Sequence, residues 1–406
     1  MSTRLVLFED ERWRDLRPLT DVVAVPALRF GGATLGERLA RATRMTPLAV
    51  LVRAALAEPV LPAGPALDPA DDVLALNAAA QPGEWLTALH AHAAPARFVT
   101  GGRIAAARLP AEIAAPGIAA GGDFERFLRE LDAPEYPCDA RLLQWPWQLV
   151  EWNAAAIADD LAGVPAERAG EVHASAVLLE PARIAIGRNA VIDPLVVLDA
   201  RGGPIRIGVN ARIAPHTVVI GPCVVGDGTQ LLGGVIGRST IGPECRLAGE
   251  IEECVWQGWA NKRHHGFVGH SVIGEWVNLG ALTTTSDLKN NYGAVRVRVD
   301  GRDVDSGATK VGAAIGAHVK TGIGTLLPTG AVVGVGANLF GGGAFAPKSV
   351  PAFGWWDGER MIEHRLESFL GTARIAMSRR GRELTPELAR RLEALFAATA
   401  KERAGG

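Results

Sequence analysis

A six-residue repeat is the feature of this chain that most restricts how it can fold. From about Val172 to Val350, an aliphatic side chain, or once a threonine, returns at every sixth position, and glycine often follows it. The recurring positions are Ile186, Ile192, Leu198, Ile207, Ile213, Val219, Val225, Leu231, Ile241, Leu247, Ile273, Leu279, Ile315, Thr321, Leu327, Val333 and Leu339. A period of six matches neither the α-helix nor a simple alternating strand. It matches a triangular prism with short strands as its sides, so we predict a parallel β-helix over 169–356.

The repeat is interrupted twice, at 254–267 and at 284–310. The second interruption is too long for a corner of the prism. Its later part alternates at Val295, Val297 and Val299, which predicts a small hairpin ending at Asp300-Gly301. Because loops that leave a rigid scaffold often carry functional residues, both interruptions are candidate sites.

The first 122 residues alternate short apolar runs with helical stretches. The runs at 4–8, 48–52 and 72–76 have the length and composition of buried strands, and 34–43 has one apolar helical face. Strands that alternate with helices are typical of a parallel layer, so we predict a Rossmann-like α/β domain over 1–122.

Two further segments complete the predicted organisation. Residues 123–168 carry many aromatic residues and several prolines, which indicates a connecting segment packed between domains. Residues 357–406 are expected to form a helical tail. Thr385-Pro386 is a favourable helix start within it, with an N-cap hydroxyl followed by proline in the first turn.

Net charge, apolar run lengths and cysteine spacing argue against a nucleic-acid-binding protein, a membrane-spanning protein and a metal site built on cysteines. The 406 residues carry a formal net charge of −2, which gives no reason to expect nucleic acid as a partner. No apolar run reaches the roughly 18 residues of a membrane span, and the start of the chain does not resemble a signal peptide. The four cysteines lack metal-type spacing. We therefore expect reduced cysteines, no metal site and a cytoplasmic location.

The most informative local segment lies at the two interruptions. It reads Asn-Lys-Arg-His-His-Gly-Phe-Val-Gly-His over 261–270, Val-Asn-Leu-Gly-Ala over 277–281 and Lys-Asn-Asn-Tyr over 289–292. This arrangement resembles the acetyltransferase domain of the bifunctional N-acetylglucosamine-1-phosphate uridyltransferase/glucosamine-1-phosphate N-acetyltransferase family. The resemblance implies a left-handed β-helix, a homotrimer, and acetyl transfer from acetyl-coenzyme A to an amino-sugar phosphate or nucleotide amino-sugar.

The same resemblance implies a role for particular residues. His264 takes the position of the catalytic base, and Phe267 and Asn278 take positions that bind the sugar substrate. Phe267 replaces the tyrosine of the family pattern. The positions that contact coenzyme A are matched by Ala281, Asn291 and Tyr292 and, by counting coils alone, by Ala317 and Val335.

The chemistry suits these side chains. Acyl transfer from a thioester to an amine needs a base that works near neutral pH, for which histidine is the natural choice. Lys262 and Lys289 are candidates to bind a phosphate of the coenzyme or of a sugar. Five of the chain's six lysines fall between 262 and 348, although arginine is far commoner in the whole sequence.

The N-terminal domain resembles, more distantly, the nucleotidyltransferase half of the same enzymes. The order of the strand at 4–8, Leu16–Thr20 and Gly31–Leu39 is kept. The glycine-rich phosphate loop is replaced by Phe8–Asp15, which places acidic residues where backbone amides would bind a triphosphate. We expect this domain to be inactive or much altered for nucleotidyl transfer, with Mg²⁺ needed only if it is active.

Three alternatives stay open at this point. The chain could be a sugar-1-phosphate nucleotidyltransferase whose β-helix serves as a trimerisation scaffold. It could hold a metal as γ-class carbonic anhydrases do, since His265 and His270 have the His-x4-His spacing, although His216 lies at the wrong distance to be the third ligand. Both halves could be regulatory or scaffold modules. The sequence names neither the acceptor sugar nor the acyl chain nor the pathway.

Overall fold

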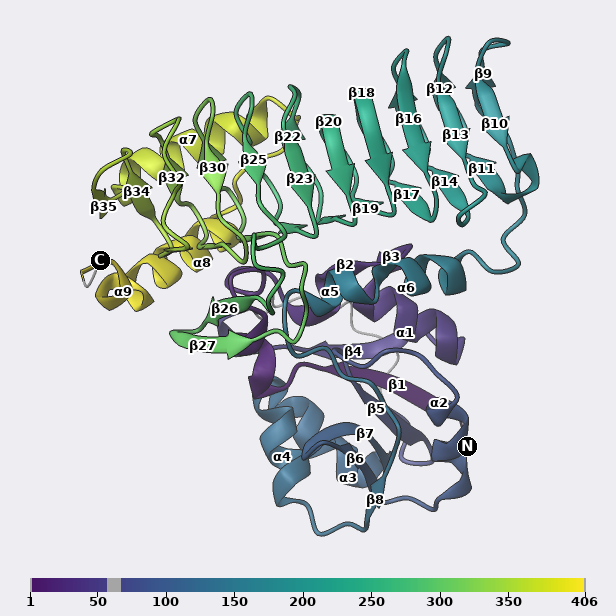
Figure 1. Ribbon diagram of the computed structural model, residues 1–406. Helices are drawn as coiled ribbons and strands as arrows, with labels where there is room; N and C mark the ends of the chain where they lie inside the picture. The colour runs from purple at the N-terminus through teal and green to yellow at the C-terminus, as the bar shows by residue number, and fades with distance from the viewer. Residues whose placement is uncertain (1, 57–66, 405–406) are drawn as a thin grey trace. The chain divides into compact units, whose positions relative to one another are not determined.

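The computed structural model describes residues 2–56 and 67–404, and the chain divides into two compact units (Figure 1). The N-terminal unit comprises 1–14, 23–28 and 33–144, and the β-helix unit comprises 15–22, 29–32 and 145–406. Within the described ranges, no helix has the length and apolar character needed to cross a membrane.

The N-terminal unit is built on a mixed six-stranded sheet. Its strands, in spatial order, are β4 (Pro47–Leu51), β1 (Thr3–Phe8), β5 (Asp72–Asn77), β7 (Arg103–Pro110), β6 (Ala96–Thr100) and β8 (Glu135–Pro137). β1 runs parallel to both β4 and β5, as predicted. β7 is antiparallel to β5 and also to β6, to which a tight turn at Gly101-Gly102 joins it. The predicted parallel layer is therefore a mixed sheet.

Both faces of this sheet are covered. In β1, Leu5 and Leu7 belong to one buried cluster, and Val6 and Phe8 belong to the cluster on the opposite face. Alternate side chains of a strand point to opposite faces, so a continuous apolar run needs cover on both. The helices of the unit are α1 (Leu35–Thr43), α2 (Trp85–Ala88), α3 (Ala111–Ala119) and α4 (Phe124–Glu130). α4 and β8 lie beyond residue 122, inside the segment that was predicted to be a connection.

The β-helix unit stacks its coils along three rows of parallel strands (Figure 1). Row A contains β11 (Ile184–Ile186), β14 (Ile205–Ile207), β17 (Cys223–Val225), β19 (Thr240–Ile241), β21 (Val255–Trp256), β24 (Val272–Ile273), β28 (Ala314–Ile315), β31 (Val332–Val333) and β33 (Ser349–Val350). Row B contains β9 (Glu171–Val172), β12 (Val191–Ile192), β15 (Arg212–Ile213), the first parts of β18 (Gln230–Gly237) and β20 (Arg246–Glu252), then β22 (Asn261–Lys262), β29 (Lys320–Thr321), β32 (Asn338–Leu339) and β34 (Gly354–Trp356). Row C contains β10 (Val177–Leu179), β13 (Val197–Asp199), β16 (Thr217–Ile220), the second parts of β18 and β20, and then β23 (Phe267–Gly269), β25 (Thr284–Thr285) and β30 (Leu326–Leu327).

The core of this left-handed β-helix confirms the six-residue pattern. All the recurring aliphatic positions are buried and form one continuous cluster. The first interruption does not leave the helix, however. Trp256 pairs in register with Ile241 and Ile273, and Lys262 pairs with Leu247, so both occupy inner positions of regular rows. The apparent break at 254–267 therefore reflects unusual side chains at inner positions and a longer corner at Arg263–Gly266.

The second interruption contains the predicted hairpin. β26 (Arg296–Val299) and β27 (Arg302–Asp305) are antiparallel, and Asp300-Gly301 forms the turn between them. Val295, Val297 and Val299 are buried in a small cluster with Trp147. Residues of the predicted connecting segment thus pack on this hairpin, within the same unit.

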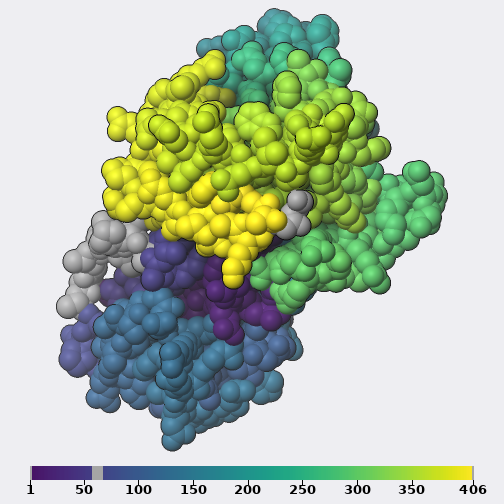
Figure 2. Space-filling view, turned by 90° about the vertical axis from the view of Figure 1, so that its left-hand side faces the viewer, coloured from purple at the N-terminus to yellow at the C-terminus, as the bar shows by residue number. Residues whose placement is uncertain are grey.

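The C-terminal tail begins with a strand before it becomes helical. β35 (Met361–Glu363) pairs antiparallel with β34, which corrects the prediction that the tail is helical from residue 357. It is followed by α7 (Leu366–Ser378), α8 (Pro386–Ala398) and α9 (Ala400–Ala404). Figure 2 shows these C-terminal residues, in yellow, gathered beside the last coils of the β-helix. Phe353 of the last coils contacts Phe369 of α7 and Phe396 of α8.

The N-cap of α8 offers a test of local stability. The Thr385 side chain accepts a hydrogen bond from the backbone N–H of Leu388 (3.2 Å), as the sequence predicted. Thr385→Ala leaves that N–H without its partner, and we expect a loss of about 1 kcal/mol in the free energy of unfolding. Thermal unfolding would measure this loss beside Ser368→Ala, which lies at an exposed, non-capping position of α7. Equal stability of the two variants would contradict the assignment of the cap.

Candidate functional site

His264 lies at the long corner that joins row B to row C, between β22 and β23. Its side chain is exposed, and no hydrogen bond or ion pair from the imidazole to any described residue is present. The main chain of this corner is held from inside the coil: the Lys262 ammonium donates to the carbonyl oxygen of His264 (2.7 Å) and to that of Ala248 (3.1 Å). The corner therefore presents a free imidazole on an anchored backbone.

Lys262 is not a phosphate-binding residue in this fold. Its side chain is fully buried at the inner position of row B, where the neighbouring coils place Leu247 and Leu279. Burial lowers the pKa of Lys262 to about 8. Because its ammonium faces two main-chain carbonyls, the prediction that it holds a phosphate is corrected to an internal anchor of the His264 corner.

Asn278 lies on the wall of a groove of about 460 Å³. The groove is bounded by row B of the β-helix and by α7 with the residues that follow it; it is lined by Arg246, Trp259, Asn261, Arg263, Trp276, Val277, Asn278, Lys320, Thr372, Ile375, Ala376, Arg379 and Arg380. The Nδ2 of Asn261 donates to the Oδ1 of Asn278 (2.7 Å), which fixes the two amides side by side. His264 directly follows Arg263, so the predicted base adjoins one wall of this groove.

Most residues that line the groove were not predicted from the sequence, although the six-residue repeat places four of them at the same register. Arg246, Asn261, Asn278 and Lys320 each stand one residue before an inner position of row B, and the ladder pairs them in order along the stack. Residues at that register share one outer face. The arginines that follow α7 could not be assigned to this face without knowing where the helix packs.

Phe267 is half-buried on the outer face of row C and packs against Gly269. A Cβ at Gly269 would lie 2.3 Å from the Cζ of Phe267, so a larger residue there would displace the ring. Phe267 belongs to row C, whereas Asn278 belongs to row B. Within one chain, the structure therefore does not bring these two predicted sugar-binding residues together.

The residues predicted to contact coenzyme A fall into two groups. Asn291 and Tyr292 are exposed in the loop that leads to the hairpin, with Tyr292 72% exposed, and Ala281 is half-buried at a corner. Ala317 and Val335 are only 5% and 0% exposed, so the predicted contact of these two positions with the coenzyme falls to their main chain. The Lys289 ammonium donates to the Ala294 carbonyl (2.8 Å), so it closes its own loop.

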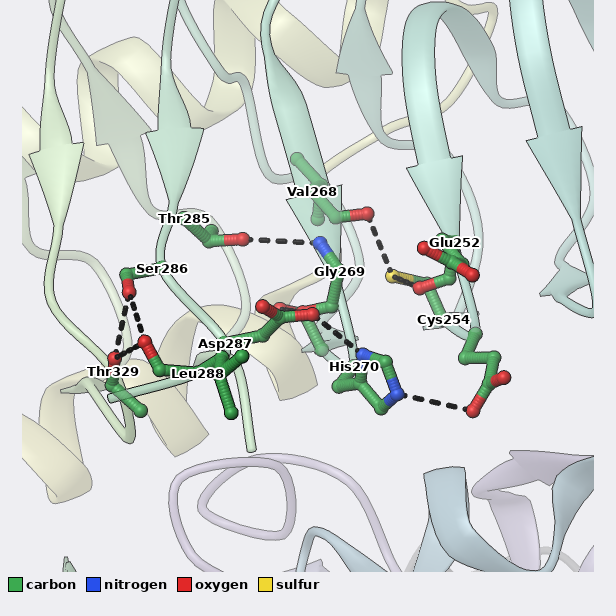
Figure 3. A network of polar contacts seen from close by, with 12 residues as sticks. Glu252, Cys254, Val268, Gly269, His270, Thr285, Ser286, Asp287, Leu288 and Thr329 are labelled. Carbon is green, nitrogen blue, oxygen red and sulfur yellow. Dashed lines mark hydrogen bonds and ion pairs between the residues drawn. The ribbon is translucent and has the colours of Figure 1, made fainter. Parts of the chain in front are cut away.

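A second histidine, His270, is locked into a charged network (Figure 3). Its Nδ1 contacts Asp287 Oδ2 (2.7 Å) and its Nε2 contacts Glu253 Oε2 (3.1 Å). Burial alone would lower the pKa of His270, but the hydrogen bonds and charges of these carboxylates outweigh it and raise the pKa to about 9. With both ring nitrogens occupied, His270 is a structural cation and not a free base. In the described part of the chain, no group of three or more His, Cys, Asp and Glu side chains is placed to hold a metal ion.

The His270 network predicts a pH dependence of stability. Because the folded-state pKa of His270 is raised above the ordinary value of 6.5, its stabilisation is complete below pH 6.5 and is lost as the pH rises through 9. One pKa unit corresponds to about 1.4 kcal/mol, so after allowance for solvent screening we expect a loss on the order of 2 kcal/mol across this window. Thermal unfolding between pH 6.5 and 9.5 should show a flatter profile for His270→Gln than for the parent protein. His265→Gln, at an exposed position, is the control. Parallel profiles for all three proteins would refute the charged network.

In the N-terminal unit, the acids after β1 have internal partners. Glu9 accepts hydrogen bonds from the Val25 N–H (2.9 Å) and from Arg53 (2.6 Å). Asp10 is bound by the Nδ2 of Asn77 (2.8 Å) and by Arg103 (2.8 Å). Glu9, Asp10 and Arg53 border a hollow of about 380 Å³ at the end of β1, on the side of the sheet where the carboxyl ends of its parallel strands meet.

Comparison with known proteins agrees with this architecture. Residues 5–169 match the family model described as sugar nucleotidyl transferase. This match gives no support to the expectation that the N-terminal domain has lost nucleotidyl transfer. The chain thus combines an N-terminal domain of sugar nucleotidyltransferase type with a hexapeptide-repeat β-helix.

Two curated proteins show the similarity at the level of sequence. The bifunctional sugar-1-phosphate nucleotidylyltransferase/acetyltransferase of Sulfurisphaera tokodaii is 34% identical over 203 residues, which cover 48% of this chain and 44% of that protein. The bifunctional protein GlmU of Methanococcus vannielii is 33% identical over 136 residues, covering 32% and 28% respectively. The chain is a distant homologue of these proteins and spans less than half the length of each.

Among solved structures, the UDP-N-acetylglucosamine acyltransferase of Francisella novicida aligns with 59% of this chain and 87% of that one, at 14% identity and a TM-score of 0.23. With so low a TM-score, the β-helix is established by the strand ladders described above and not by this similarity.

Proposed function

We propose that the β-helix unit transfers an acetyl group from acetyl-coenzyme A to the amine of an amino-sugar phosphate or nucleotide amino-sugar. The observation that carries this proposal is the placement of His264. Its free imidazole stands at an anchored corner, directly after Arg263, and the groove that Arg263 lines also contains Asn278. The name of the Sulfurisphaera tokodaii relative, which includes acetyltransferase, supports this activity.

His264 has the role of general base in the proposed reaction. As the amine nitrogen attacks the thioester carbonyl, His264 accepts the amine proton. The new C–N bond forms, the C–S bond breaks, and the proton passes to the departing thiolate. Coenzyme A supplies the thioester, and the exposed Asn291 and Tyr292 with Ala281 are the residues proposed to hold it.

A homotrimer is part of the proposal. Large apolar side chains are exposed on the C-terminal coils, including Leu282 (57%), Ile323 (71%) and Phe340 (63%). Clustered apolar exposure of this kind is typical of an interaction surface. Sedimentation analysis of the full chain should give the mass of three copies, and a monomer would remove this part of the proposal.

The test is an acceptor-dependent release of free thiol. Purified protein is incubated with acetyl-coenzyme A and a panel of amino sugars, amino-sugar phosphates and nucleotide amino-sugars. We expect thiol release only with an acceptor that carries a free amine, together with a mass gain of one acetyl group on that acceptor. The absence of release with every acceptor, in a folded protein, would overturn the proposal.

The match over residues 5–169 favours a second function, sugar-1-phosphate nucleotidyl transfer by the N-terminal unit. Pyrophosphate release from a nucleoside triphosphate and a sugar 1-phosphate would test it. The residues present fit Mg²⁺ poorly, because the carboxylate of Asp10 is already bound by Arg103 and Asn77. We therefore derive no step that uses the metal.

A further inference from the structure

The β26–β27 hairpin projects from the stack of coils (Figure 1). It lies in the same insertion as the loop that carries Asn291 and Tyr292. The two are joined closely, because the Lys289 ammonium donates to the carbonyl of Ala294 (2.8 Å) and thereby closes the loop directly before the hairpin. The next residue, Val295, is already part of the buried cluster under the hairpin. A shift of the hairpin would therefore move the loop.

Only one face of the first hairpin strand is packed. Val295, Val297 and Val299 are buried, whereas the alternate side chains of Arg296 and Arg298 are exposed. Apolar burial is non-directional, so it holds the hairpin against its neighbours without fixing its tilt. A two-stranded hairpin is also only marginally stable by itself. Its exact position therefore depends on directional contacts at its tip.

The tip is gripped on both sides of its turn by a segment from the start of the chain. Residues 15–22 belong to the β-helix unit. The Arg17 guanidinium donates to Asp300 Oδ1, before the turn (2.7 Å). Arg302, after the turn, forms an ion pair with Asp15. We call these four residues the tip clamp, because two ion pairs from residues two apart restrain both strands of the hairpin.

Arg17 is itself held by further carboxylates. Its Nε donates to Asp21 Oδ1 (2.6 Å), and its guanidinium also reaches Glu402 of α9 (3.2 Å). The side chains of Arg17 and Asp21 are only 17% and 3% exposed, so water and salt screen these pairs less than fully exposed ones. A planar guanidinium can contact several carboxylates at once, which the single ammonium of lysine does less well.

We propose that Arg17 is a positioning residue for the coenzyme A site. By fixing the tip of the hairpin, it keeps the loop of Asn291 and Tyr292 in the geometry that binds the coenzyme. Pre-ordering a loop in this way improves affinity, because less conformational freedom is lost on binding. The inference rests on the proposed acetyl transfer and adds to its site a residue that touches neither substrate.

Calorimetric titration of the full chain with coenzyme A tests this role. The variants are Arg17→Ala, Asp300→Asn and the double substitution. Asparagine suits position 300, since the backbone there is left-handed (φ 48°), a conformation that asparagine adopts readily, and it removes the charge alone. Arg298→Ala is the matched control, because Arg298 is exposed on the same hairpin and pairs with Asp303 of that hairpin (3.7 Å).

We expect Arg17→Ala to bind coenzyme A about tenfold more weakly than the parent, and Asp300→Asn about threefold more weakly. The double variant should be no weaker than Arg17→Ala, because both substitutions remove the same contact. KM for acetyl-coenzyme A should rise with Kd, while the binding stoichiometry and kcat at saturation stay within about twofold of the parent. A merely structural role would lower the stoichiometry and leave Kd unchanged. The control should bind as the parent does.

Two results would overturn the positioning role. One is an Arg17→Ala variant with the Kd of the parent, and the other is a double variant whose loss equals the product of the two single losses. If Arg17→Ala does not fold, Asp300→Asn carries the test, since its side chain is 29% exposed and its removal spares the core. Equal Kd values for Asp300→Asn and Arg298→Ala would then contradict the inference.

The outcomes also distinguish this inference from the proposed function. Binding of coenzyme A that depends on Arg17, without thiol release for any acceptor, would support the positioning role and remove acetyl transfer. Acetyl transfer with the same KM for acetyl-coenzyme A in the parent and in Arg17→Ala would keep the function and remove the positioning role. A parent protein that binds no coenzyme A would remove both.

Discussion

Replacing His264 with alanine is expected to lower kcat/KM for acetyl transfer by about 10²- to 10⁴-fold, the usual contribution of a positioned general base. The side chain is exposed and contacts no described partner through its imidazole, so its removal should leave the coil intact. KM for the sugar substrate should change little, because His264 acts on the proton that leaves during the reaction. Steady-state rates of thiol release, with thermal unfolding as a check of the fold, provide the measurement.

His265→Ala is the matched control for this experiment. His265 is the adjacent residue, is also exposed, and has no side-chain hydrogen bond to the described part of the chain. We expect it to keep most of the activity. If His265→Ala lost the activity and His264→Ala kept it, the base would be the other histidine of the corner. If both variants kept it, no histidine of this corner would be the base.

The β-helix could be predicted because its core imposes a simple rule on the sequence. Every coil needs three inner side chains, so a six-residue apolar period appears wherever the coils are regular, as at Ile207, Ile213 and Val219. The rule fails where a polar residue takes an inner position. Lys262 breaks the pattern because its acceptors are main-chain carbonyls, and their position depends on the geometry of the corner.

The parts of the site that escaped prediction depend on stacking between coils or on helix packing. Glu253 and Asp287 each lie 17 residues from His270, the distance from one coil to the next through irregular segments. Assigning each residue of those irregular segments to its coil would have placed Glu253 and Asp287 beside His270. Arg379 and Arg380 are a different case, because no local pattern states which face of the β-helix α7 covers.

Lys262→Met is expected to lower kcat by about tenfold while leaving KM for acetyl-coenzyme A unchanged. Methionine has a similar length and is apolar, so it suits an inner position flanked by Leu247 and Leu279. It cannot donate to the His264 carbonyl, which the ammonium reaches at 2.7 Å. Without that anchor the corner can shift, and a displacement of about 1 Å in a reacting group can cost far more than tenfold in rate.

The pH dependence of stability shows whether the same lysine is buried as described. A lysine whose folded pKa is lowered from 10.5 to about 8 binds its proton less readily in the folded chain than in the unfolded chain. Its contribution to stability is therefore present above pH 10.5 and is lost as the pH falls through 8. Between these values the parent protein should gain stability relative to Lys262→Met as the pH rises.

Lys310→Met, at an exposed position, should follow the parent in both rate and pH profile. A Lys262→Met variant with the kcat of the parent would show that the lysine does not position the His264 corner.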